Sequence, residues 1–154
     1  MNPLIYEINT RVWIRQFDTP SERATLDDVP EQVWIDLKKN GFDAVWLMGV
    51  WKTSKDLIEK CCFESGLVQS YDKALGDWKK EDVIGSPYSI EAYRVSPDLG
   101  TTAELRWLKG IMNQHGLSLI LDFIPNHFGA STPLLKEMPE AFLQVSRETY
   151  ESDP

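Results

Sequence analysis

The segment 117–129, LSLILDFIPNHFG, constrains the fold most, because an apolar run passes directly into polar residues. Its apolar positions cannot be divided into a wet face and a dry face. They are therefore typical of a strand that is covered on both sides in a parallel sheet. Pro125 has no N–H group and disfavours helical angles at the residue before it. The sequence thus predicts a strand over 117–123 that leaves Asp122 at its end, with Asn126 and His127 on the following loop.

Two earlier segments predict further strands with helices between them. Residues 4–9 alternate apolar and polar side chains, and residues 42–50 are apolar except for Asp43. A helix is expected from Pro30 to the stop at 40–41, and a second from the capping box at 101–104 to the stop at 115–116. Alternating strands and helices predict a parallel α/β sheet. Ligands bind such sheets at the carboxyl ends of the strands, so this edge is the expected site.

The segment 51–100 is far longer than a usual connection between strand and helix, which indicates a functional insertion. It contains no strand pattern of comparable strength and one short helical candidate at 56–62. Aromatic residues are spread through it and at its start, and each either faces a sugar or anchors the loop. They are Trp51, Phe63, Tyr71, Trp78, Tyr88 and Tyr93.

Charge and cysteine content narrow the classes of partner. Sixteen basic and twenty-four acidic residues give a net charge of −8, which disfavours nucleic acid and anionic membranes as partners and favours a neutral ligand. No apolar run is long enough to span a membrane, and no signal-peptide pattern opens the chain, so we expect a cytoplasmic protein. Cys61 and Cys62 are adjacent and are expected to be reduced thiols on a helix.

The polar residues after the third strand allow more than one role. Asp122 either serves a ligand, as a charge partner, a base or a hydrogen-bond acceptor, or caps local N–H groups at the strand end. His127 either donates to a ligand hydroxyl or is a loop histidine with a local partner. Asn126 either orients the loop or offers an oxygen to Ca²⁺. Phosphate-binding glycine loops, cysteine–histidine metal spacing and the GxSxG elbow do not occur in the sequence.

Four segments, taken in order and spacing, carry a resemblance to a known family. They are YEINTRVW, FDAVWLMGVW, SPYSIEAYRVSPDLGTTAEL and LILDFIPNH. Together they resemble the start of the catalytic barrel of glycoside hydrolase family 13, the α-amylase family, over about residues 4–129. The resemblance implies an eight-stranded (β/α) barrel of the TIM type. Residues 1–154 would form the N-terminal part of that one catalytic domain, with strands one to three and an insertion at about 51–100 after strand two.

The resemblance also implies roles for individual residues. Tyr88 matches the aromatic that stacks on the sugar beside the scissile bond, and His127 matches a histidine that hydrogen-bonds the same sugar. Asp122 matches an aspartate that braces the active-site arginine, and Trp51 lies at the same mouth. Asn126 matches a position that binds a structural Ca²⁺ in many members, while no cofactor is required. Ser89 stands where many members have aspartate, which bears on substrate preference.

The implied activity is retaining hydrolysis of α-glucosidic bonds in α-glucans or oligosaccharides. Such enzymes use a carboxylate nucleophile and a second carboxyl group about 5–5.5 Å away. The Arg-x-Asp motif of the nucleophile and the later His-Asp pair do not occur here. A complete barrel of this type takes about 250 residues. We therefore expect these 154 residues to be inactive alone and to require the remainder of the barrel. The alternatives are a transglycosylase of the same family and a relative that binds sugar or a protein partner without catalysis.

Overall fold

The three predicted strands form one parallel sheet in the computed structural model, which describes residues 2–152. In sheet order the strands are β1 (Ile5–Asn9), β2 (Ala44–Met48) and β5 (Ser118–Leu121). Ile8 lies opposite Leu47, and Leu47 lies opposite Leu121, so these three side chains share one face. The predicted parallel α/β sheet is confirmed, with the third strand ending at Leu121 instead of 123. Within the described residues, β1 and β5 are its two edges.

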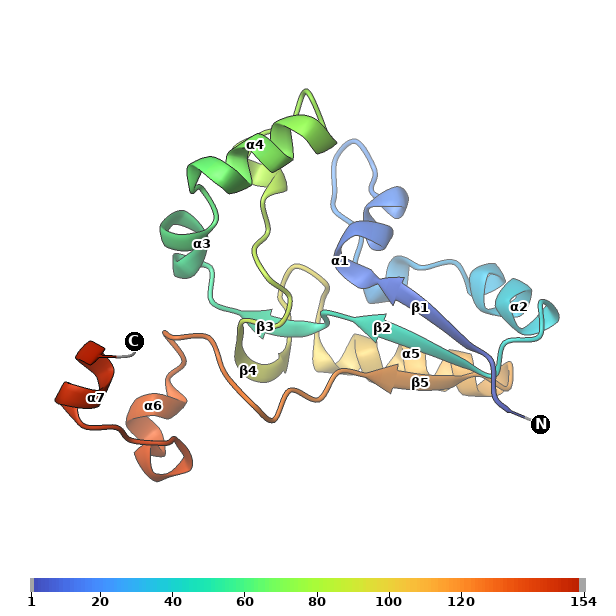
Figure 1. Ribbon diagram of the computed structural model, residues 1–154. Coiled ribbons are helices and arrows are strands. Elements are labelled where there is room, and N and C mark those ends of the chain that lie inside the picture. Colours follow the sequence, from blue (N-terminus) through green and yellow to red (C-terminus); the bar gives the residue numbers. More distant parts are fainter. Residues whose placement is uncertain (1, 153–154) are drawn as a thin grey trace.

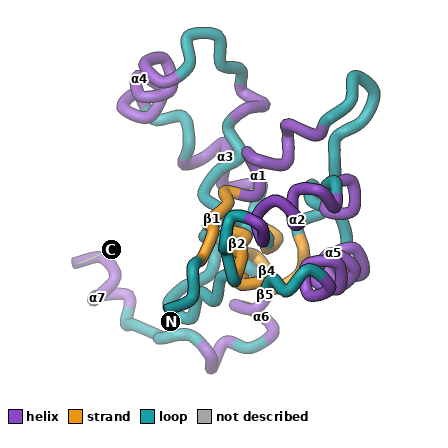
Figure 2. The backbone as a smooth tube through the Cα atoms, turned by 90° about the vertical axis from the view of Figure 1, so that its right-hand side faces the viewer, coloured by secondary structure: helices purple, strands orange, loops and turns teal. Residues whose placement is uncertain are grey.

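Two helices cover one face of this sheet (Figure 2), namely α2 (Glu31–Lys39) and α5 (Thr102–Gln114). Their apolar side chains form the core together with those of β2. The fully buried members include Trp34, Val45, Leu47, Leu108 and Met112. The predicted capping box is present, since the Thr101 hydroxyl accepts from the Glu104 N–H at 3.3 Å and the Glu104 carboxylate accepts from the Thr101 N–H.

The opposite face of the sheet is open within residues 2–152. Ile5 is 50% exposed, Glu7 is exposed, and Trp46 and Ile120 are only half-buried. The prediction that the third strand is covered on both sides is therefore wrong for this part of the molecule. Apolar residues on both faces show that each face suits burial, but the layer that would cover the second face is not formed by the described residues.

Two short antiparallel strands, which we call the hairpin, lie near the two ends of the insertion. β3 (Trp51–Thr53) pairs with β4 (Ile90–Val95), placing Trp51 opposite Val95 and Thr53 opposite Ile90. The absence of a strand pattern between 51 and 100 was therefore misleading. Irregularities on both sides of Lys52 interrupt the two-residue period on which strand recognition depends.

Between these strands the chain forms two small helices, α3 (Asp56–Cys61) and α4 (Ser65–Ala74), which have no buried residue. Figure 1 shows α4 standing away from the sheet. α3 confirms the helical candidate at 56–62, and Cys61 and Cys62 at its end are free thiols. The Tyr71 hydroxyl donates to the Cys62 carbonyl at 3.0 Å, and the Tyr71 ring packs edge-on against Trp78. For these two aromatics the anchoring interpretation matches the structure.

The remaining elements are single turns. α1 (Thr10–Trp13) follows β1 directly, and 3-10 turns occur at Ile14–Phe17, Leu26–Asp28, Lys80–Asp82 and Pro139–Ala141. After the loop 122–133 the chain forms α6 (Leu134–Glu137) and α7 (Arg147–Ser152), which lie away from α2 and α5 (Figure 1). The helical turns expected at 133–145 are confirmed by α6 and the 3-10 turn after it. Across residues 2–152, none of the helices has the length and apolar character needed to cross a membrane.

Candidate functional site

The carboxyl ends of β2 and β5 meet at Asp122, the first residue after β5. One carboxylate oxygen, Oδ1, accepts from the Trp46 indole N–H at 2.8 Å. The other, Oδ2, accepts from the Gly49 backbone N–H at 2.6 Å. Asp122 therefore ties the end of β5 to β2 and to the turn that follows β2. This geometry matches the interpretation of Asp122 as a strand-end aspartate that caps N–H groups, and each oxygen retains a further lone pair.

Trp51 lies beside the same strand end. Its indole N–H donates to the backbone carbonyl of Asp122 at 2.8 Å, and its ring packs edge-on against Tyr93 with centroids 5.4 Å apart. The backbone and the side chain of Asp122 are thus both held by tryptophans, one from β2 and one from β3. The expected proximity of Trp51 and Asp122 is present in the structure.

Arg11 holds the turn between β2 and β3 through its side chain. Its guanidinium donates to the carbonyls of Gly49 at 2.8 Å and Trp51 at 2.7 Å, and to the Thr53 hydroxyl at 3.0 Å. Burial lowers the pKa of Arg11, while the nearby Asp98 carboxylate acts in the opposite direction. Gly49 has a φ of +74°, so the turn needs a residue that adopts left-handed angles without strain.

Tyr88 lines a cavity of about 420 Å³ on the open face of the sheet. Trp46, Ile120 and Asp122 line the same cavity, and the Tyr88 hydroxyl donates to the Met48 sulfur at 3.3 Å. Burial raises the pKa of the Tyr88 phenol, and the negative charges of Asp122 and Glu7 raise it further. The phenol is therefore a neutral hydrogen-bonding group near pH 7, and the structure brings it together with Asp122.

Asn126 and His127 lie on the loop after β5, and neither lines that cavity. Both side chains are exposed and form no hydrogen bond or ion pair with another residue among 2–152. Within the same residues no group of three or more histidine, cysteine, aspartate or glutamate side chains is placed to hold a metal ion. Asn126 alone offers one amide oxygen, far fewer than the six to eight ligands of Ca²⁺. Its assignment to Ca²⁺ stays a prediction.

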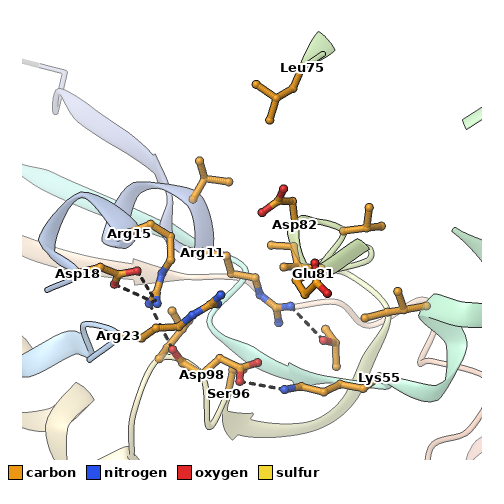
Figure 3. A pocket seen from close by; sticks show the side chains of 16 residues that line it. Arg11, Arg15, Asp18, Arg23, Lys55, Leu75, Glu81, Asp82, Ser96 and Asp98 are labelled. Atoms are coloured by element: carbon orange, nitrogen blue, oxygen red, sulfur yellow. Dashed lines mark hydrogen bonds and ion pairs between the residues drawn. The ribbon is translucent and has the colours of Figure 1, made fainter. Parts of the chain in front are cut away.

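A larger cavity, of about 580 Å³, lies between the segment after β1 and the insertion (Figure 3). Four basic and four acidic side chains line it: Arg11, Arg15, Arg23, Lys55, Asp18, Glu81, Asp82 and Asp98. Several of these pair across its wall, including Arg15 with Asp18 at 3.1 Å and Lys55 with Asp98 at 2.9 Å. None of the predicted site residues lines it. The smaller cavity beside Asp122 is therefore the better candidate, because it lies where parallel sheets bind ligands.

The structure adds Trp46, Gly49 and Arg11 to this region, none of which was among the predicted site residues. Trp46 lies opposite Ile120 in the register of β2 and β5, and Asp122 follows Ile120 by two residues. Since alternate residues share a face, Trp46 and Asp122 lie on the same face of the sheet. Counting alternate positions along the two strands could have found it. Gly49 immediately after a strand was a second signal, because a glycine there permits a tight turn. Arg11 had no such signal, because its partners are 38–42 residues away in the sequence.

Comparison with solved structures finds the same fold among α-amylases and related hydrolases. The α-amylase from Lactobacillus plantarum matches with a TM-score of 0.62 at 22% identity, over 94% of this chain and 27% of that one. An α-amylase from Geobacillus thermoleovorans, solved with acarbose, matches at 0.53 and 22%, over 90% and 26%. Trehalose-6-phosphate hydrolase from Bacillus licheniformis matches at 0.58 and 15%, over 88% and 20%. No protein-family model and no curated protein matches the chain.

These similarities define the fold class of the chain. The matched α-amylases are TIM-barrel proteins, and the small parallel sheet of this chain, with helices on one face, is consistent with a part of such a domain. The resemblance to the α-amylase family that was expected from four sequence segments is thereby confirmed at the level of the fold. The chain spans about a quarter of the length of the α-amylases that it matches.

Proposed function

We propose that this chain supplies the N-terminal part of a (β/α)8 barrel in an α-glucan-active glycoside hydrolase, with β1, β2 and β5 as the first three barrel strands. The observation that carries the proposal is the position of Asp122. It lies at the carboxyl end of β5, is bonded to β2 and its turn, and borders a cavity on the open sheet face. In a closed barrel this face becomes the interior, and ligands bind at the carboxyl ends of its strands.

In this proposal the described residues form one wall of a sugar-binding site. Tyr88 offers a flat, neutral ring to a sugar face, and Trp51 shapes the mouth beside it. Asp122 uses its remaining lone pairs to orient an arginine contributed by another part of the barrel. His127 is exposed and has no partner within residues 2–152, which leaves its imidazole free to bond a sugar hydroxyl. A neutral oligosaccharide also suits a chain with a net charge of −8.

The chemical step belongs to groups outside the residues of this chain. In a retaining glycosidase a carboxylate forms a covalent bond to the sugar while a second carboxyl protonates the leaving oxygen. Water then attacks the same sugar carbon, giving its proton to the second group, and the first carboxylate leaves. The Arg-x-Asp motif is not in this sequence. The role of Tyr88, Asp122 and His127 is to hold the sugar and its surroundings in place during both steps.

The test uses the protein expressed from its complete reading frame, with release of reducing ends from maltooligosaccharides as the assay. His127→Ala should lower kcat/KM about tenfold, the effect of losing a hydrogen bond of about 1.4 kcal/mol. His115→Ala is the matched control, because His115 bonds Glu31 at 2.7 Å at the other end of the sheet. Both substitutions remove one imidazole, but His115 lies away from the candidate site. The control should therefore change kcat/KM by no more than about twofold.

Other results would redirect the proposal. Release of longer oligosaccharides in place of reducing ends would identify a transglycosylase. Binding of maltooligosaccharide, seen by tryptophan fluorescence, without any product would identify a sugar-binding relative without catalysis. A folded protein that neither binds nor converts α-glucans would overturn the proposed function.

A further inference from the structure

The loop that carries Asn126 and His127 is held by a tyrosine from the hairpin. The Tyr93 hydroxyl accepts from the backbone N–H of Ile124 at 2.7 Å and donates to the backbone carbonyl of the same residue at 2.9 Å. A phenol has one proton and oxygen lone pairs, so it satisfies both groups at once. Ile124 is buried and lies past the end of β5, where strand pairing no longer serves its backbone.

The ring of Tyr93 is fixed by aromatic neighbours on several sides. Trp51 and Phe128 pack edge-on against it, with ring centroids 5.4 Å and 5.9 Å away. Phe123 stacks on it with a centroid distance of 6.0 Å and an interplanar angle of 25°. Phe123 and Phe128 enclose residues 124–127 in the sequence. The ring therefore packs against both ends of the short loop while its hydroxyl holds the first residue.

A second bond from the same strand completes the attachment. The backbone N–H of Gly129 donates to the carbonyl of Ile90, the first residue of β4, at 2.7 Å. The loop is thus fixed at Ile124 and Gly129, both times by β4. Pro125 has no N–H to donate, and the side chain of His127 is exposed without a hydrogen bond to another described residue. The position of the imidazole consequently depends on these two attachments.

We propose that Tyr93 is a positioning residue that sets the place of the His127 imidazole in the sugar-binding site. This inference rests on the proposed function and assigns Tyr93 an indirect role, in place of contact with sugar. Its hydroxyl is engaged on both sides by Ile124, so it acts on the ligand only through the loop. Loss of the hydroxyl would leave the aromatic packing and release the backbone of residue 124.

The test is a double-mutant cycle in the protein expressed from its complete reading frame. Tyr93→Phe keeps the ring and removes both hydrogen bonds, and should lower kcat/KM for maltooligosaccharides about tenfold, chiefly through KM. In the His127→Ala background the same change should alter kcat/KM less than twofold. Tyr6→Phe is the control. Tyr6 has the same 39% exposure as Tyr93 and forms no side-chain hydrogen bond to another described residue. It lies opposite Val45, on the sheet face that α2 and α5 cover, away from the cavity beside Asp122. It should leave kcat/KM unchanged.

Amide hydrogen exchange adds a measurement that does not depend on activity. Tyr93→Phe should speed exchange in peptides covering 124–129 and leave β5 unchanged. Full additivity in the cycle, or unchanged exchange in the loop, would overturn the role of Tyr93 as a positioning residue. Faster loop exchange in a folded protein that neither binds nor converts α-glucans would instead refute the proposed function, and with it the sugar-positioning role, while showing that Tyr93 anchors the loop.

Discussion

Replacement of Asp122 by asparagine tests the central contact of the candidate site with the smallest change of shape. Each carboxylate oxygen accepts one N–H, from Trp46 at 2.8 Å and from Gly49 at 2.6 Å. An amide keeps one acceptor oxygen and turns an NH₂ group towards the other donor. One of the two hydrogen bonds is therefore lost, and the surviving one no longer has a charged acceptor.

The expected cost follows from these two bonds. A hydrogen bond to a charged group contributes about 1.5–3 kcal/mol, and an unsatisfied buried N–H costs about 1–3 kcal/mol. Because Asp122 is only half-buried, water offsets a part of this loss. We expect Asp122→Asn to lower the free energy of unfolding by about 2 kcal/mol.

The assay is urea unfolding of the protein expressed from its complete reading frame. The free energies of unfolding of variant and wild type are compared where both show the same dependence on urea concentration. Asp77→Asn is the matched control, since Asp77 is exposed and makes no hydrogen bond or ion pair with another described residue. Its effect should stay within about 0.5 kcal/mol. Equal effects of the two substitutions would refute the reasoning, because the Asp122 carboxylate would then not hold β2 and its turn.

Three further predictions concern the turn after β2, the phenol of Tyr88 and the sheet edges. Gly49→Ala should destabilise by about 2–4 kcal/mol in urea unfolding, because the added methyl would lie 2.7 Å from the Pro87 Cβ at a positive φ; Gly110→Ala, which meets no atom, should stabilise by about 0.5–1 kcal/mol. Ultraviolet titration should show Tyr88, by difference from Tyr88→Phe, ionising above its usual 10.0. The unfolded chain releases this proton at lower pH than the folded chain. Ionisation of Tyr88 should therefore lower the free energy of unfolding as the pH rises past about 10. Residues 1–154 alone should be unstable or self-associated through the edges β1 and β5, and a cooperatively melting monomer in light scattering would contradict this.

The parallel sheet and its two covering helices were predictable because each depends on local signals. Apolar runs located β2 and β5, and the Thr101 capping box located the start of α5. Gly41 and Gly116 follow the two helices with φ of +92° and +72°, which explains why they were reliable stops. These signals involve neighbours in sequence, so no knowledge of the tertiary structure was needed to use them.

The hairpin was not predictable because its pattern is formed by tertiary packing. β4 buries Ile90 and Val95, which are five positions apart and so belong to opposite faces of an ideal strand. β3 has three residues and irregular pairing on both sides of Lys52. The same limit applies to the site, where the hydroxyl of Tyr93 meets a backbone 31 residues away. An aromatic side chain within a polar insertion allowed both sugar contact and anchoring for Tyr93, and the sequence could not choose between them.

The hairpin explains how a long insertion can coexist with a defined site. Trp51 begins the insertion and pairs with Val95 near its end, so the two strands close the loop at its base. The cost of closing a flexible loop rises only with the logarithm of its length, so residues 54–89 add little to it. β3 and β4 contact the region around Asp122 through Trp51 and Tyr93, and β4 also bonds the loop after β5 through the carbonyl of Ile90. The positions of Trp51 and Tyr93 beside Asp122 therefore depend on the pairing of this hairpin. Helices α3 and α4 have no buried residue, so they can change in length or sequence with little effect on these two side chains.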